Sequence, residues 1–99
     1  MITYMIRPLS FDWDKFNQEK NWLKHKVDYR ECEEVFLNQP IKLLIDKKHS
    51  QKEDRFFALG LTDKKRKLII SFTLRSGKVR IISARDQSQK ERRIYEKET

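Results

Sequence analysis

The sequence predicts an α+β fold in which two N-terminal helices are followed by a four-stranded antiparallel sheet and a C-terminal helix. Between residues 14 and 37 the apolar side chains recur at the three- and four-residue spacing of helices. Between residues 41 and 85 they gather instead in short runs rich in Ile, Val, Phe and Leu, as strands do. The turns between the last three runs are too short for parallel crossovers, so neighbouring strands are expected to pair antiparallel.

The chain is short and strongly charged. It has 99 residues, of which 37% are hydrophobic and 38% are charged. We therefore expect one domain over residues 1–99, built around a single small core. High charge favours disorder, but the periodic apolar runs and a total of only 2 Gly and 2 Pro argue for a folded chain.

The first helix is predicted over residues 14–25 and has two distinct sides. One side carries the apolar residues Phe16, Leu23 and Val27, with Trp13 just before the helix. A polar stripe, whose members recur at steps of four, three and four, comprises Asn17, Asn21, Lys24 and Asp28.

The second helix is predicted to start after Asp28 and to end near Leu37. Asp28 and Glu31 have the spacing of a capping box, and the sequence Asn-Gln-Pro at residues 38–40 is a stop signal. Its apolar stripe comprises Tyr29, Cys32, Val35 and Phe36. We expect Cys32, as part of this stripe, to be an inert core thiol.

Four strands and a last helix follow. The strands are predicted over residues 41–46, 55–61, 67–74 and 78–85, with a polar loop at 47–54 and turns at 63–66 and 76–77. The charged tail from residue 86 onward is predicted to be helical, capped by Asp86 or by Ser88 with Glu91. The helices are expected to cover one face of the sheet and to leave a basic, partly open face for a ligand.

The charge balance limits the possible partners. Lys and Arg total 23 against 15 Asp and Glu, which gives a formal net charge of +8 at pH 7. Such a field attracts phosphate backbones or an acidic protein.

No apolar run is long enough to cross a bilayer, and the N-terminus lacks the features of a signal peptide, so we expect a cytoplasmic protein. The single cysteine excludes an intramolecular disulfide and a cysteine-based zinc site.

The residues suited to chemistry are arginines, lysines and histidines. The sequence has no Gly-rich phosphate loop, and His25 and His49 lack the spacing of metal ligands. Cleavage of RNA without a metal requires a group that takes a 2′-hydroxyl proton, cations that stabilise the phosphoryl oxygens, and an acid for the leaving 5′-oxygen. The candidates are Lys24, His25, Glu53, Arg55, Arg80, Arg85, Glu91, Arg92 and Tyr95.

These candidates also have ordinary structural interpretations. His25 can stabilise the C-terminus of the first helix. Glu53 and Arg55 point to one face of a strand and can form an exposed ion pair worth less than ~1 kcal/mol. The basic run at residues 64–67 is expected to be a solvated turn or, alternatively, a phosphate-contacting patch.

Three groups of residues together resemble the BrnT toxin family. The first comprises Phe11-Asp12-Trp13-Asp14-Lys15, Asn21, Lys24-His25, Val27, Tyr29 and Val35-Phe36. The second comprises Glu53-x-Arg55 and Gly60. The third comprises Arg80-Ile81-Ile82-Ser83-Ala84-Arg85, Glu91-Arg92 and Tyr95. The matches run in order from residue 11 to residue 95, so residues 1–10 form an N-terminal extension outside the family motif.

The resemblance implies a RelE-like fold and a ribonuclease toxin of a type II toxin–antitoxin pair. It also implies a BrnA-like antitoxin, typically with a ribbon-helix-helix DNA-binding part, and repression of the operator DNA by the complex. We expect this antitoxin to contact the open sheet face and the terminal helix through Ile94 and Tyr95, unless these side chains only anchor the helix. Lys26 replaces a Gly that is usual in the family and suits a left-handed helix cap, so this helix is expected to end differently.

Together with the residue chemistry, the resemblance identifies a site without a metal or other cofactor. The expected catalytic residues are His25, Arg55, Arg80 and Arg85, and the expected substrate contacts are Lys24, Glu53, Glu91 and Tyr95. Histidine, with an ordinary pKa near ~6.5, suits an acid or a base, and the arginines would hold the scissile phosphate. The alternative function is a non-catalytic basic module that binds an acidic protein or a nucleic acid.

Overall fold

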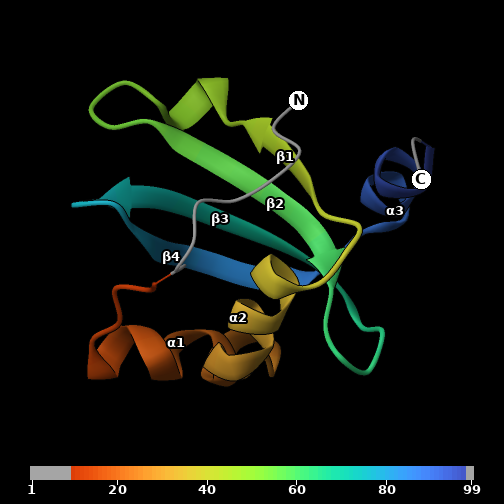
Figure 1. The fold of residues 1–99 in the computed structure, drawn as a ribbon, viewed down its shortest axis with the longest axis horizontal. Coiled ribbons are helices and arrows are strands. Elements are labelled where there is room, and N and C mark those ends of the chain that lie inside the picture. The colour runs from red at the N-terminus through yellow and green to blue at the C-terminus, as the bar shows by residue number, and fades with distance from the viewer. Residues whose placement is uncertain (1–9, 98–99) are drawn as a thin grey trace.

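The computed structural model describes residues 10–97, and in these it has three α-helices and one four-stranded sheet (Figure 1). The elements are α1 (Lys15–His25), α2 (Tyr29–Leu37), β1 (Lys42–Ile45), a 3-10 turn η1 (Lys47–His49), β2 (Arg55–Leu61), β3 (Lys67–Arg75), β4 (Lys78–Asp86) and α3 (Gln89–Lys97). The strands are antiparallel throughout and lie in the order β1-β2-β3-β4. The predicted fold class is confirmed. The turn η1 is the one element that was not predicted, because residues 47–54 were expected to be plain loop.

The main core lies between α2 and one face of the sheet. Alternate strand residues supply that face, and the buried ones are Ala58, Leu68, Ile70, Phe72, Val79, Ile81 and Ala84. Phe36 of α2 packs edge-on against Phe72, with the ring centroids 5.0 Å apart. A Cβ on Gly60 would lie 2.9 Å from Val35 Cγ1, so glycine there lets α2 approach β2 closely. Cys32 is fully buried, and burial raises the pKa of its thiol to about 12, which makes it inert as predicted.

The opposite face of the sheet carries a second, smaller apolar cluster, to which α3 contributes. Leu59, Ile69 and Tyr95 are buried in it, and Leu44, Phe57 and Leu61 pack around them. The prediction that the helices cover one face only is therefore wrong for α3. Because Phe56 and Phe57 are consecutive in β2, this strand has large apolar side chains on both faces, and each face needs some cover.

The helix α1 lies along the free edge of β4 and attaches to it through polar side chains. Asn17 Nδ2 donates to the Ile81 carbonyl at 2.7 Å, and the Ala84 amide donates to Asn21 Oδ1 at 3.1 Å. The Lys20 ammonium donates to the Ile82 carbonyl. These bonds satisfy backbone groups that an uncovered edge strand would leave unpaired.

The helix α1 therefore turns its polar stripe, and not Phe16 and Leu23, toward the sheet. The buried side chains of this helix are Asn17 and Asn21, whereas Phe16 is 75% and Leu23 73% exposed. The reason is that α1 faces a strand edge, which presents N–H and C=O groups, and not an apolar sheet face.

The helix termini are fixed by local hydrogen bonds. The capping box of Asp28 and Glu31 at the start of α2 is confirmed. At the start of α3, Ser88 and Glu91 cap each other reciprocally, so Ser88 is the capping residue and not Asp86. Lys26 ends α1 in the left-handed conformation with φ 56°, and its amide donates to the Trp22 carbonyl. The expectation that lysine would alter this helix end is wrong, since the left-handed cap is kept.

The predicted N-terminal extension, residues 1–10, lies outside the described residues except for Ser10, whose carbonyl accepts from the Val79 amide at 3.0 Å. In the described part of the chain, no helix is both long and apolar enough to cross a membrane.

Candidate active site

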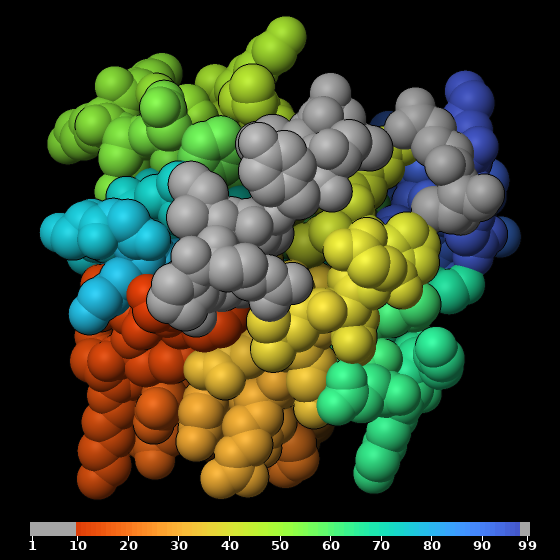
Figure 2. Space-filling model, viewed as in Figure 1, coloured from red at the N-terminus to blue at the C-terminus, as the bar shows by residue number. Residues whose placement is uncertain are grey.

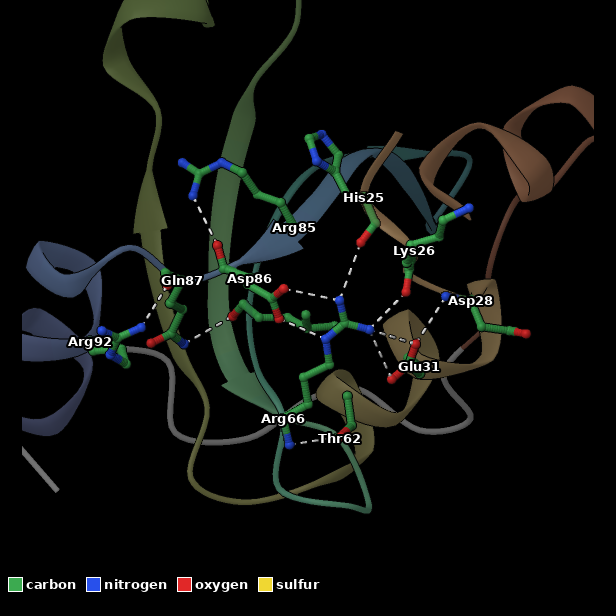
Figure 3. A network of polar contacts seen from close by, with 11 residues as sticks. His25, Lys26, Asp28, Glu31, Thr62, Arg66, Arg85, Asp86, Gln87 and Arg92 are labelled. Carbon is green, nitrogen blue, oxygen red and sulfur yellow. Dashed lines mark hydrogen bonds and ion pairs between the residues drawn. The ribbon is translucent and has the colours of Figure 1, made fainter. Parts of the chain in front are cut away.

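The side chain of Arg66, just before β3, joins three elements at the C-terminal end of β4 (Figure 3). Its Nε and Nη2 donate to the two Asp86 carboxylate oxygens at 2.6 and 3.1 Å. Its Nη1 donates to the Lys26 carbonyl at 2.8 Å and its Nη2 to the His25 carbonyl at 3.2 Å. Nη1 also lies 3.2 Å from Glu31 Oε1 at the start of α2. This arrangement, here named the Arg66 clamp, fixes the end of α1 against the end of β4.

The charges of the clamp reinforce one another. The hydrogen bond from Arg66 lowers the pKa of Asp86 below its ordinary value, and the positive charges of Arg66 and His25 add to this effect. The same hydrogen bond raises the pKa of Arg66. Both partners therefore stay ionised across the physiological range, and the clamp persists with them.

The clamp brings His25 and Arg85 to the same end of the sheet. His25 is the last residue of α1 and is exposed, as is its neighbour Lys24. Arg85 is the last but one residue of β4. Figure 3 shows both side chains extending away from the Arg66 guanidinium toward the same side of the network. An imidazole and a guanidinium are thus held at one end of the sheet.

Arg85 is paired with Glu91 from the first turn of α3. Its Nη1 and Nη2 donate to the two Glu91 carboxylate oxygens, each at 2.8 Å. The Arg85 hydrogen bond, helped by the hydrogen bond from the Ser88 amide, lowers the pKa of Glu91 to about 2. A carboxylate this acidic is too weak a base to take a hydroxyl proton near neutral pH. Glu91 therefore orients Arg85, whose side chain remains 46% exposed.

The other two predicted arginines lie elsewhere on the same sheet face. Arg55 pairs in register with Thr73, and Thr73 pairs with Arg80, so the three form one row across the strands. Arg85 pairs with Ile69, four residues along β3 from Thr73, which corresponds to roughly 13 Å. Arg55 and Arg80 therefore do not converge with Arg85 on a single phosphate.

Both arginines of this row have carboxylate partners. Arg55 lies 3.5 Å from Glu53, as the spacing of the two residues predicted. Arg80 lies 3.0 Å from the Asp14 carboxylate and 3.5 Å from that of Asp12. Among the described residues the Nε of Arg55 is one of the few side-chain polar atoms that are buried without a hydrogen-bond partner.

Tyr95 is placed differently from the other candidates. It is 3% exposed, and its hydroxyl donates to the Pro40 carbonyl at 2.6 Å. The side chain therefore anchors α3 to the rest of the fold and does not face a ligand. Anchoring was the alternative to partner contact in the sequence analysis.

Two polar groupings were not predicted from the sequence. Arg66 was expected to be part of a solvated turn, and its partners lie 20 to 41 residues away in the chain, so no local pattern indicates its role. His49 Nδ1 lies 3.0 Å from Oδ2 of the buried Asp46, at the end of β1 beside Arg55. The three-residue spacing of Asp46 and His49 after a strand was the signal that could have indicated this pair.

The arrangement offers cations and an imidazole at the edge of an open sheet face. Guanidinium groups bind phosphate oxygens and stabilise charge that develops on them, and an imidazole transfers protons near neutral pH. Within residues 10–97, no three His, Cys, Asp or Glu side chains gather as they would to hold a metal ion.

A family model described as ribonuclease toxin, BrnT, of type II toxin-antitoxin system matches residues 13–91. The chain belongs to the BrnT family. The match to BrnT runs from the residue before the N-cap of α1 to the first turn of α3, and so includes the Arg66 clamp and all four predicted catalytic residues. Membership of this family implies a ribonuclease toxin with an antitoxin partner. No curated protein matches the chain.

Proposed function

We propose that this BrnT protein is a metal-independent endoribonuclease whose catalytic centre lies at the Arg66 clamp. The observation that carries the proposal is that one side chain, Arg66, holds the backbone of His25 against the strand end that carries Arg85. These two residues are 60 positions apart in the chain, and the hydrogen bonds of Arg66 to the His25 carbonyl and to Asp86, the neighbour of Arg85, support their acting at one site as proton-transfer group and oxyanion-stabilising cation.

In the proposed reaction the RNA 2′-hydroxyl attacks the adjacent phosphorus atom. Neutral His25 takes the hydroxyl proton as the new P–O bond forms, and the imidazolium returns that proton to the 5′-oxygen as the old P–O bond breaks. Arg85, oriented by Glu91, stabilises the charge on the non-bridging oxygens. The products are a 2′,3′-cyclic phosphate and a free 5′-hydroxyl, so no water is consumed in the step.

The remaining predicted residues bind the RNA on either side of the cleaved bond. Arg55 and Arg80 lie roughly 13 Å along the sheet from Arg85, and their role is to hold a neighbouring part of the phosphate backbone. Glu53 orients Arg55 through their ion pair, and Lys24 adds positive charge next to His25.

The antitoxin is proposed to be BrnA-like, with a ribbon-helix-helix DNA-binding part through which the complex represses its own operator. The BrnT chain is proposed to act in the cytoplasm, where its RNA substrate is found, and to have a RelE-like fold. These finer points are supported by the family relationship and by the net charge of +8.

The site is tested by a charge-matched pair of variants. Arg85→Ala removes the oxyanion cation, and Arg93→Ala removes an exposed arginine of α3 with the same change in net charge. We expect Arg85→Ala to slow cleavage of single-stranded RNA by about 10²–10³-fold, as loss of an oxyanion-hole donor does, and Arg93→Ala to change it by less than about threefold.

Circular dichroism of both variants checks that the fold is intact. Equal cleavage by Arg85→Ala and the wild type would remove Arg85 from the catalytic centre. A wild-type protein that binds RNA but leaves it uncut would instead support the alternative of a non-catalytic basic module.

A further inference from the structure

The helix α1 lies at the surface of the molecule (Figure 2), and its outward side presents large apolar side chains to solvent. Phe16 is 75%, Leu23 73% and Trp22 49% exposed. Leu23 follows Phe16 by seven residues, close to two helical turns, so the two side chains lie one above the other, with Trp22 beside them. Of the six large hydrophobic side chains found exposed in residues 10–97, these are three. We name Phe16, Trp22 and Leu23 the α1 patch.

The patch continues into a groove at the start of α2. The groove has a volume of about 420 Å³ and is lined by Gln18, Glu19, Trp22, Leu23, Asp28 and Tyr29. An apolar side chain from a partner that packs on Trp22 and Leu23 would therefore also find a recess beside the Tyr29 ring.

Folding of the chain itself does not require the α1 patch. The helix is attached through Asn17 and Asn21, which lie on its other side, and through the Lys20 ammonium, and all three bond to the backbone of β4. Apolar side chains that stay exposed on a helix face are not removed from water when the chain folds. When several gather on one face, they are typical of a protein–protein contact. The patch is therefore a surface available to a partner.

The charges around the patch determine what kind of partner fits. Lys15, Lys20 and Lys24 belong to α1, and the Lys26 ammonium lies 5.3 Å from the centre of the Trp22 ring. Against these four lysines stand two carboxylates, Glu19 in the helix and Asp28 in the lining of the groove. A second copy of the chain would bring these lysines and two net charges of +8 together, which opposes self-association. An apolar segment flanked by carboxylates would be attracted.

We infer that the α1 patch is the docking surface for the antitoxin, which binds it through an apolar segment flanked by acidic residues. The inference rests on the antitoxin partner that family membership implies and not on the proposed catalytic residues. The patch ends two residues before His25, so a partner seated on it stands beside the candidate active site and obstructs the approach of RNA. The buried Tyr95 on α3 offers no comparable apolar surface.

The test compares two exposed positions on α1 with one on the opposite edge of the sheet. The full-length chain carries Phe16→Gln with Leu23→Gln, or Ile45→Gln as a control, since Ile45 is 64% exposed on β1. Binding of the purified cognate antitoxin is measured by calorimetry, which needs no RNA cleavage. We expect at least ~100-fold weaker binding for the double variant and less than about threefold for the control.

Affinity of the double variant within about threefold of the wild type would overturn the inference. So would a free wild-type protein that sediments as a dimer while the double variant is a monomer with unchanged antitoxin affinity, because the patch would then bind a second copy. A second readout, which uses the patch of the wild-type chain unchanged, is Trp22 fluorescence. Its emission should shift to shorter wavelength in the wild-type complex, and this shift should be missing from Trp22→Phe. A complex in which Trp22 stays as solvent-exposed as in the free protein contradicts the proposal.

Discussion

Glu91 keeps its negative charge to unusually low pH because both of its oxygens accept hydrogen bonds from Arg85. Its pKa falls from an ordinary 4.5 to about 2 in the folded protein. Folding therefore stabilises the ionised form, so the pair contributes to stability fully above about pH 4.5, and this contribution is lost as the pH falls toward 2. The upper limit from the shift is about 3 kcal/mol, and the partial exposure of Arg85 reduces it.

The variant Glu91→Gln tests this pair and keeps the shape of the side chain. We expect it to lower the free energy of unfolding by about 1–2 kcal/mol at pH 7 and by almost nothing at pH 2. Urea denaturation followed by circular dichroism at several pH values measures the difference. A loss of stability that is the same at pH 7 and pH 2 would show that the charge of Glu91 does not matter.

At the scale of elements, the edge of β4 explains why α1 is oriented with its asparagines inward. Asn21 Oδ1 accepts from the buried Ala84 amide, and no apolar side chain can replace that acceptor. Two residues later, the Leu23 side chain faces solvent and is 73% exposed. Hydropathy alone would favour the opposite arrangement of these two positions.

A reciprocal pair of substitutions separates the two arrangements. Asn21→Leu leaves a buried N–H without an acceptor, and we expect it to cost about 2–3 kcal/mol of the free energy of unfolding. Leu23→Asn changes only an exposed position, and we expect a cost of about 0.5 kcal/mol from helix propensity. Thermal or urea unfolding measures both. If Asn21→Leu proves as stable as the wild type, α1 does not cover the edge of β4 in this way.

The features predicted correctly from the sequence are those that depend on near neighbours in the chain. The strand periodicity places β2 as observed, and the capping boxes at Asp28 and Ser88 involve residues three positions apart. The orientation of α1 and the position of α3 depend on which part of the sheet each helix meets, and hydropathy does not encode that. The edge of β4 selects Asn17 and Asn21, because only polar side chains satisfy its backbone groups.

The candidate site shows the same contrast between residues that were predicted and a long-range contact that was missed. His25 and Arg85 were expected from their residue types and from the family resemblance, and the structure brings them to one end of the sheet. Arg66, which joins them, was missed because its partners come from α1, α2 and β4. A run of four basic residues in a turn gives no indication that one of them points inward.

On the scale of the whole molecule, α1 connects the two proposed activities. One end of this helix is held by the Arg66 clamp next to Arg85, and its outer side carries the α1 patch. Antitoxin binding and RNA cleavage would thus use neighbouring surfaces of one element. The row of Arg55 and Arg80 extends the basic surface across the sheet. Inhibition then requires no change in the fold, because a bound partner covers the approach to His25.

The most direct test of the proposed catalytic centre is cleavage of a single-stranded RNA in excess EDTA by the wild type, His25→Gln and His49→Gln. The two histidines are both exposed, and their replacement by glutamine keeps a polar side chain of similar size. We expect the wild type and His49→Gln to cut the RNA at rates within about threefold of each other, and His25→Gln to be slower by at least ~100-fold. Cleavage by His25→Gln at the wild-type rate, or wild-type cleavage that appears only when Mg²⁺ is restored, would contradict a metal-free site at the Arg66 clamp.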